Sequence, residues 1–262
     1  LINIEQDDKV KAFICTQDLK DEDYINSQFV IMATKKGQVK KTSLEQYSRP
    51  RTNGINAITI KEDDELLEAK LTTGASQVML ALKSGKAIRF EEAKTRPMGR
   101  GASGVRGITL AHETDEVIGM IAVDDMESNI LVVSENGYGK RSSLEDYRIT
   151  NRGGKGVKTI SITEKTGNLV SIKNVIDEDD LMIINKSGVA IRLAVEDLRV
   201  MGRATQGVRL INLKANDSIA AVAKVMREDE DEIDDSEELT NEAIKETNLS
   251  QTGEASADTQ EE

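Results

Sequence analysis

The sequence predicts an all-β protein built from four similar units, each with four short strands. Two sets of glycines recur along the chain at nearly constant spacing, and each set has four members. Apolar runs alternate with polar turns around these glycines, which is typical of short β-strands. A unit of about 50 residues cannot bury both faces of its own sheet, so we expect the units to stack around a centre like blades.

The first half of each unit predicts a β-hairpin. An apolar run is followed by a polar turn with glycine and then by a second run that carries a cation. The turn glycines suit positive-φ conformations, which residues with a side chain rarely adopt. These glycines are Gly37, Gly85, Gly137 and Gly188, spaced 48, 52 and 51 residues apart in the segments 29–47, 78–94, 130–147 and 181–198.

The second half of each unit predicts two more strands. A glycine opens a run of alternating Val, Ile and Leu, as in "SGVRGITL" and "QGVRLINL", and a polar turn and a last apolar strand follow. Strict alternation of this kind indicates a strand with one buried face. The opening glycines are Gly54, Gly104, Gly156 and Gly207, spaced 50, 52 and 51 residues apart.

Both ends of the chain bear on its organisation. Residues 1–14 align with 210–223, the closing part of a unit, so we expect a partial repeat at 1–28 that lies next to an unpaired strand edge. Because the chain starts within a repeat and without Met, we expect a fragment of a longer protein with at least one repeat upstream. The complete repeats are expected at about 29–77, 78–129, 130–180 and 181–226, and a disordered acidic tail at 227–262.

The charge is distributed unevenly. The net charge of −12 arises in the tail from residue 227, which holds 15 acidic residues and two cations, whereas residues 1–226 carry 33 cations and 32 acids. An acidic block with few apolar residues is expected to stay disordered. It is either a solubilising tail or a phosphate mimic that competes with a polyanionic partner for cations elsewhere in the chain.

Composition narrows the class of protein. Apolar residues make up 38% of the chain and aromatic residues 3%, so Val, Ile, Leu, Ala and Met must form the core. The single cysteine, Cys15, cannot form an intramolecular disulfide, and we expect it to be a buried apolar residue in a reducing compartment. No apolar run reaches 18 residues and no signal peptide is recognisable, so a cytoplasmic location is expected.

A cation-rich loop lies between the two glycines of every unit. A row of Arg and Lys on a curved surface suits the phosphates of bent duplex DNA, and glycines nearby expose N–H groups to phosphate without reading sequence. Few aromatic residues accompany the cations, which disfavours single strands. The predicted DNA-binding residues are Arg49, Arg51, Arg96, Arg100, Arg106, Arg148, Arg152, Gly153, Gly154, Lys155, Gly156, Lys158, Arg199, Arg203 and Arg209, and Lys94 belongs to the same set of cations.

These motifs resemble one protein family. "RGGKG" at 152–156 matches the last five positions of the Gln-Arg-Arg-Gly-Gly-Lys-Gly box in the C-terminal domain of the gyrase A protein, part of the type IIA topoisomerase DNA gyrase. The first two positions, Thr150 and Asn151, differ, and the family's box lies in the first blade rather than in a later one. "NGYGKRS", "SGVRGITL" and "VMGRATQGVRLI" also look like gyrase repeats, so the resemblance covers residues 1–226.

The resemblance implies a β-pinwheel, a propeller-like disc whose neighbouring blades exchange strands. It implies duplex DNA as the partner, wrapped without sequence preference around the perimeter in support of ATP-dependent negative supercoiling. It also implies an A2B2 enzyme, in which the partners are the gyrase B protein and a second copy of the gyrase A protein, with ATP and Mg²⁺ outside this segment. The alternatives are the A-type protein of topoisomerase IV, which acts in decatenation, and a propeller-like scaffold that binds proteins.

No catalytic constellation is recognisable in the sequence. His112 is the only histidine and lies in a polar turn, so a surface role is expected and metal binding is not. "RGGKG" lacks the spacing of a nucleotide-binding P-loop. Tyr47, Tyr138 and Tyr147 occupy repeat positions, which favours structural use over nucleophilic catalysis. We expect no cofactor and no activity in this segment alone.

Overall fold

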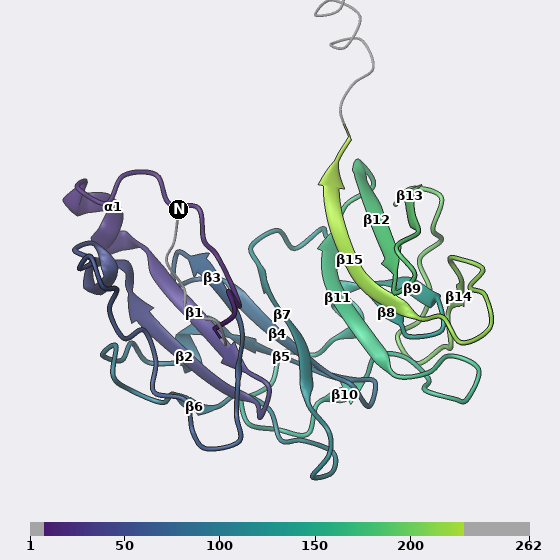
Figure 1. The fold of residues 1–262 in the computed structure, drawn as a ribbon, viewed down its shortest axis with the longest axis horizontal. Helices are drawn as coiled ribbons and strands as arrows, with labels where there is room; N and C mark the ends of the chain where they lie inside the picture. Colours follow the sequence, from purple (N-terminus) through teal and green to yellow (C-terminus); the bar gives the residue numbers. More distant parts are fainter. Residues whose placement is uncertain (1–7, 228–262) are drawn as a thin grey trace, which may run out of the picture. The chain divides into compact units, whose positions relative to one another are not determined.

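The computed structural model describes residues 8–227, and the acidic block predicted to be a disordered tail lies almost wholly outside these residues. The described strands form antiparallel sheets that follow one another along the chain (Figure 1). Their strands, in spatial order, are β3 (Leu66–Thr72), β1 (Phe29–Thr34), β2 (Gln38–Ser43) and β6 (Val105–Arg106) in the first sheet; β10 (Val157–Lys158), β5 (Lys86–Glu91), β4 (Gln77–Leu82) and β7 (Val117–Val123) in the second sheet; β11 (Leu169–Val175), β8 (Asn129–Ser134), β9 (Tyr138–Ser143) and β14 (Val208–Arg209) in the third sheet; and β13 (Ala190–Ala194), β12 (Asp179–Asn185) and β15 (Ile219–Met226) in the fourth sheet.

The predicted hairpins are confirmed. β1–β2, β4–β5, β8–β9 and β12–β13 are antiparallel pairs. The turn glycines of the first set, Gly37, Gly85, Gly137 and Gly188, have φ between 78° and 86°. A side chain at these positions would be strained, which explains why the turns carry glycine.

Neighbouring repeats exchange strands, as the resemblance implies. β6, β10 and β14 each follow the hairpin of one repeat but pair with the hairpin of the repeat before it, as Figure 1 shows for β6 beside β2. The backbone N–H of Gly107, directly after β6, also donates to Gly37 O in the preceding hairpin turn at 2.8 Å. Each of the first three sheets therefore needs residues from two repeats.

The prediction of a full strand after each opening glycine is wrong in extent. β6, β10 and β14 are two residues long, and residues 55–60 of the first repeat form no strand. The exchange explains this difference, because the segment pairs only where the preceding repeat presents a hairpin edge. Among the described residues, the hairpin before residues 55–60 is that of their own repeat, and no earlier repeat presents a hairpin edge.

The first described residues also differ from the prediction. Residues 8–14 form no strand, since a closing strand pairs with the first strand of its own hairpin and the described residues hold none before them. A short helix, α1 (Glu22–Ser27), follows, and the Asp21 side chain caps it by accepting from two backbone N–H groups. Cys15 is exposed rather than buried.

The hydrophobic core lies between consecutive sheets, which explains why the first hairpin strands are continuously apolar. In β4, Val78 and Leu80 belong to a buried cluster with residues of the first sheet, whereas Met79 and Ala81 belong to a cluster with residues of the third sheet. A strand that is buried on both faces has no polar side. The stacking of repeats predicted from their size is thus confirmed at the level of side chains.

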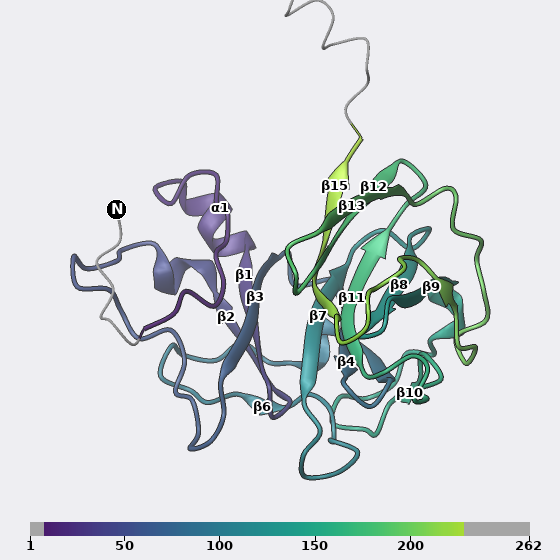
Figure 2. The ribbon, with the colours of Figure 1, turned by 45° about the vertical axis from the view of Figure 1, so that its right-hand side comes forward.

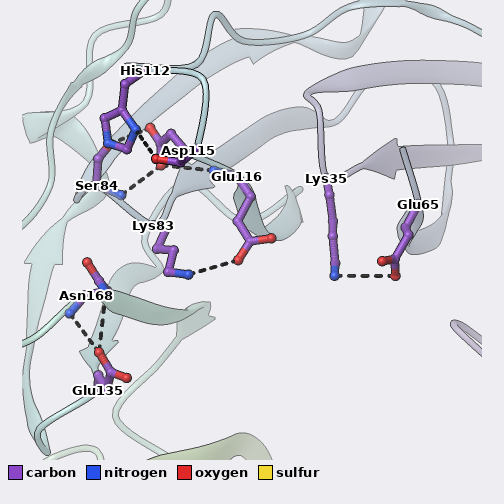
Figure 3. A network of polar contacts seen from close by, with 10 residues as sticks. Lys35, Glu65, Lys83, Ser84, His112, Asp115, Glu116, Glu135 and Asn168 are labelled. Carbon is purple, nitrogen blue, oxygen red and sulfur yellow. Dashed lines mark hydrogen bonds and ion pairs between the residues drawn. The ribbon is translucent and has the colours of Figure 1, made fainter. Parts of the chain in front are cut away.

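A recurring backbone contact joins the hairpin turn of each repeat to the closing strand of the next repeat. Lys35 N donates to Glu65 O of its own repeat, and Lys35 O accepts from Val117 N of the next repeat, both at 2.9 Å. Lys83 and Glu135 make the equivalent pairs of bonds in the following repeats. Figure 3 shows side-chain bonds beside these contacts, including Lys35–Glu65 at 3.4 Å and Lys83–Glu116 at 3.3 Å.

The closing strands of neighbouring repeats are also in contact. β3 contacts β7, and β7 contacts β11, so the three strands follow one another in space as they do in the sequence (Figure 2). Because both the closing strands and the exchanged strands connect neighbours, residues 8–225 form one unit.

Candidate functional site

Four loops carry the predicted cations, and we number them loop 1 (48–59), loop 2 (95–109), loop 3 (148–161) and loop 4 (199–211). Loops 1, 2 and 3 follow short 3₁₀ segments (Leu44–Tyr47, Glu92–Lys94 and Leu144–Asp146), and loop 4 follows a turn. Loops 2, 3 and 4 then run along the second hairpin strand of the preceding sheet. Isolated parallel bridges mark the first contact of each loop with that strand: Lys41 with Pro97, Arg89 with Ile149, and Arg141 with Val200. Each of these three loops contains, near its end, the exchanged strand described above.

The opening glycines allow the loops to lie against these strands. Gly156 has φ +71°, and a Cβ atom there would lie 2.6 Å from Ala87 O. Gly104 and Gly207 have φ +88° and +82°, and a Cβ atom at either position would lie 2.5 Å from a strand carbonyl oxygen. Both the backbone conformation and the close approach therefore require glycine. Gly54 in loop 1 has φ +76° but open space around it.

The loops contact one another in chain order. Thr59 N in loop 1 donates to Ala102 O in loop 2 at 3.3 Å, and Ser161 N in loop 3 donates to Thr205 O in loop 4 at 3.1 Å. Thr109 makes the same bond between loops 2 and 3, to Gly154 O at 2.9 Å. The repeated bond places the four loops, and with them the predicted cations, in one adjoining row.

Two lysines lie beneath the row. Lys40 in β2 and Lys140 in β9 are 0% and 1% exposed. The Lys40 ammonium donates to the carbonyls of Ala57 in loop 1 and Arg100 in loop 2, and the Lys140 ammonium donates to Gly202 O in loop 4 at 2.6 Å. These bonds fix loop carbonyls that turn toward the strand.

Burial lowers the pKa of both lysines to about 8, because a charged ammonium loses its hydration there. The charge of Arg100 lowers the pKa of Lys40 further. At Lys140, the Asp146 carboxylate opposes the shift and the Arg203 guanidinium adds to it. The position in β5 that corresponds to both lysines is Ile88, so the buried charge is not common to all repeats.

The cation noted in the second run of each hairpin is also buried in three repeats. Arg89, 8% exposed, donates to Leu144 O at 2.7 Å and to Tyr147 O at 3.0 Å, so it binds the 3₁₀ turn that leads into loop 3. Burial lowers its pKa. Arg141 binds Leu198 O and the Asp177 carboxylate in the same way before loop 4. Arg89 and Arg141 therefore bind the backbone before loops 3 and 4 and are shielded from solvent.

Most of the predicted DNA-binding cations are exposed. Within residues 8–227, the structure gives no side-chain hydrogen bond or ion pair to eight of them. These exposed cations are Arg49, Arg51, Arg96, Arg106, Arg148, Lys155, Lys158 and Arg199. Arg100 is half-buried, and Lys94 lies 3.9 Å from the Glu91 carboxylate.

Two predicted residues join neighbouring loops instead. Arg152 donates to Lys94 O at 3.0 Å and to Arg106 O at 3.1 Å, and Arg203 donates to Lys158 O at 2.8 Å. A guanidinium has five N–H donors, so each of these residues keeps donors for a ligand while it holds the loop before it. The sequence did not distinguish these residues from the fully exposed cations.

The "RGGKG" stretch covers a cavity of about 220 Å³. Arg148, Asn151, Lys155 and backbone atoms of Gly154 and Gly156 contribute to its lining. Gly153, with φ +82°, donates its N–H to Gly107 O in loop 2 at 2.6 Å. The stretch therefore brings the exposed Lys155 beside the exposed Arg148, on a loop whose backbone is fixed by its neighbour.

Other chemistry is sparse in the part of the chain that the structure describes. The described residues contain no group of His, Cys, Asp and Glu side chains suited to a metal ion. His112 is exposed, and its Nδ1 lies 3.0 Å from Thr114 Oγ1. Tyr147 is buried against Thr159 Oγ1 at 2.5 Å, in line with a structural role. Of the helices that are described, none is long and apolar enough to cross a membrane.

Comparisons with known proteins agree with this geometry. The family model described as "DNA gyrase C-terminal domain, beta-propeller" matches four segments, residues 28–73, 78–124, 128–176 and 179–226. The chain is 46% identical over 240 residues to the DNA gyrase A protein of Staphylococcus aureus strain NCTC 8325, and 47% identical to that of strain MRSA252. These matches cover 91% of this chain and 26% of the relatives, so the chain spans about a quarter of their length.

Solved structures show the same fold. A gyrase A C-terminal domain superposes with a TM-score of 0.75 at 24% identity, covering 86% of this chain and 73% of that one. A C-terminal domain of DNA topoisomerase IV gives a TM-score of 0.73 at 24% identity, covering 78% and 63%. The repeat-by-repeat match of the family model, together with the sequence identity to gyrase A proteins, assigns the chain: it belongs to the family of DNA gyrase C-terminal domains.

Proposed function

We propose that loops 1 to 4 bind duplex DNA without sequence preference and bend it along their row. One observation carries the proposal: the loops adjoin in chain order, and eight of their cations are exposed without a described side-chain partner. Phosphates recur regularly along a duplex, so a regular row of cations meets them in any sequence. Glycine N–H groups of the "RGGKG" stretch add donors that contact phosphate but do not read bases.

The energetics are compatible with bending. Bending a duplex of 20–30 base pairs by 40–90° costs on the order of 1–6 kcal/mol. The release of counterions by phosphate contacts in successive loops offsets this cost, and it makes the affinity strongly dependent on salt. Acidic residues near the loops, such as Glu91 and Asp146, reduce the attraction.

For the whole protein, we propose the role that its relatives' name indicates. DNA wrapped by this domain is presented to a cleavage domain elsewhere in the protein, within a cytoplasmic A2B2 complex that also contains the gyrase B protein. ATP and Mg²⁺ act in that complex and not in this domain. The 46% identity to gyrase A proteins supports this proposal over decatenation by topoisomerase IV.

The salt dependence of binding tests the proposal. The affinity of the chain for two unrelated duplexes of about 40 base pairs is measured by fluorescence anisotropy between about 50 and 200 mM KCl. With six or more phosphate contacts, affinity should fall by about 10³-fold or more over this range, equally for both duplexes. Substituting Arg148, Lys155 and Lys158 of loop 3 together by Gln should reduce the slope of log K against log salt by about 2 to 3.

A matched variant controls for the loss of charge. Lys9, Lys20 and Lys61 are exposed and lie outside the loops, so their joint substitution by Gln removes the same charge at other places. This control should change the slope by less than about 1. A weak salt response of the unmodified chain, or equal effects of the two triple variants, would show that the loops are not the DNA-binding surface.

A further inference from the structure

A second cationic site lies beside Tyr138, at the start of β9. A cavity of about 290 Å³ opens there, and its lining includes Tyr138, Lys165, Arg209 and Lys214. Arg209 belongs to the exchanged strand β14 and lies directly opposite Tyr138 in the strand register. Only Arg209 was predicted from the sequence, because the other groups lie outside the loops.

The phenol of Tyr138 is surrounded by cations. Arg209 donates to its oxygen from Nη2 at 2.8 Å and from Nε at 3.2 Å, and the guanidinium carbon lies 5.4 Å from the ring centre. The Lys165 ammonium lies 5.3 Å from the same ring centre. The hydrogen bond from Arg209, helped by the charge of Lys165, lowers the pKa of the phenol.

The hydroxyl group of Tyr138 can donate a hydrogen bond as well as accept one. Tyr138 is 6% exposed, and its oxygen accepts both bonds from Arg209. Among the described residues, none accepts the phenolic hydrogen. The hydroxyl borders the cavity, so an anionic oxygen bound there could accept its hydrogen.

One carboxylate, Asp217, also lines the cavity, but its oxygens are already occupied. They accept from Asn185 Nδ2 at 2.6 Å, from Ser187 Oγ at 2.7 Å and from Ser218 N at 2.8 Å. Lys165 and Lys214 have no described carboxylate partner. The cavity is thus lined by three cations and one carboxylate, and the oxygens of that carboxylate already accept hydrogen bonds from neighbouring residues.

The other exchanged strands lack this arrangement. The residue opposite Arg106 in β6 is Gln38, and the residue opposite Lys158 in β10 is Lys86. The aromatic ring between two cations therefore occurs at one of the three described exchanges. A device for strand exchange in general would be present at all three, so this cluster has another use.

We propose that the cavity beside Tyr138 is a binding site for a phosphate oxyanion. Arg209 and the two lysines supply charge-assisted hydrogen bonds, and the Tyr138 hydroxyl donates a further one. The phosphate belongs to the duplex backbone, because Arg209 ends the exchanged strand of loop 4 and the cavity adjoins the row of loops. This choice of source rests on the proposed function, whereas the oxyanion site itself does not.

Pyrophosphate is the first probe. The ¹⁵N-labelled chain is titrated with pyrophosphate at constant ionic strength, and amide shifts are followed by NMR. Saturable shifts are expected at Tyr138, Arg209 and residues 165–167. Tyr138→Phe keeps the ring and removes the donor, so it should weaken binding about five- to tenfold. Lys165→Gln, at an exposed position, should do the same and keeps the test valid if Tyr138→Phe misfolds.

The matched control is Lys61→Gln. Lys61 occupies the position of the first repeat that corresponds to Lys214, and no phenol accompanies it, so pyrophosphate binding should not change. Shifts that do not saturate would overturn the proposal. Equal effects of Lys61→Gln and Lys165→Gln would also overturn it, since general charge would then explain the binding.

Duplex DNA is the second probe, and it identifies the source of the phosphate. If the duplex backbone occupies the site, Lys165→Gln also weakens binding of a duplex of about 40 base pairs severalfold, and pyrophosphate competes with the duplex. If only pyrophosphate binding depends on Lys165, the site takes free phosphate compounds instead. Failure of the loop 3 variant to alter the salt slope would count against the proposed function and leave the pyrophosphate result standing.

Discussion

Replacing Lys140 by methionine removes a charge that is buried beneath loop 4 while keeping a side chain of similar length. The Lys140 side chain is 1% exposed, and its ammonium donates to Gly202 O at 2.6 Å. The neighbouring hairpin shows that an apolar residue is tolerated at this position, because Ile88 occupies it in β5. The variant should therefore fold.

At pH 7 the substitution has two opposing effects on the free energy of unfolding. A pKa lowered from 10.5 to about 8 corresponds to about 3 kcal/mol against the charged form in the fold. The lost hydrogen bond from a charged donor contributes about 1.5–3 kcal/mol in the opposite direction. The difference between the two effects leaves an expected change in the free energy of unfolding of at most about 2 kcal/mol.

The difference should grow as the pH rises. Between about pH 8 and 10.5 the folded chain binds fewer protons at Lys140 than the unfolded chain, so the unmodified protein gains stability with pH through this group. The gain between pH 7 and pH 9 is about 1 kcal/mol, and Lys140→Met lacks it. Other titrating groups are common to both proteins and cancel in the difference.

Urea denaturation at pH 7 and pH 9 measures the effect, with Ile88→Met as a control that carries no charge at the corresponding position. From pH 7 to pH 9, the stability difference between the unmodified protein and Lys140→Met should shift by about 1 kcal/mol in favour of the unmodified protein. A difference that is independent of pH would refute the reasoning, and so would a shift of the opposite sign.

Four further substitutions test the loops, with urea denaturation as the measurement. Gly156→Ala should cost more than about 2 kcal/mol because its Cβ would meet a strand carbonyl, whereas Gly54→Ala should cost only the strain of positive φ, about 1–2 kcal/mol; equal costs would argue against the close approach. Arg89→Met should cost about 2–4 kcal/mol by removing the bonds to Leu144 O and Tyr147 O, and a neutral result would mean that water replaces the donor. Tyr147→Phe should cost about 1–2 kcal/mol through the loss of its bond to Thr159, and no loss would contradict that bond.

Local conformation was the most predictable part of the fold. Gly137 and its equivalents predict hairpin turns, because glycine adopts positive φ at little cost, and all four glycines have positive φ. The continuous apolar runs indicated buried strands for a similar reason. Strand exchange, in contrast, came from the family resemblance, because Val105 and its equivalents look the same whether they pair within a repeat or with the repeat before.

The site was predictable in position but not in the role of each cation. Arg96 and Arg152 look alike in the sequence, yet Arg96 is exposed, whereas Arg152 binds the carbonyls of Lys94 and Arg106. Lys40 and Lys140 were missed because lysines are rarely buried. Their alignment with Ile88 across the hairpins was the available signal, since a position that accepts Ile in one repeat lies in the core.

Strand exchange also has a consequence for synthesis on the ribosome. β2 ends at Ser43, but the strand that completes its sheet begins at Val105, about 60 residues later. At translation rates of about 5–20 residues per second, each new hairpin presents an open edge for roughly 3–12 seconds before its partner emerges. The sheet of one repeat is therefore completed only after most of the next repeat has been synthesised. A pause within a repeat prolongs the time for which the hairpin edge of the repeat before it stays unpaired.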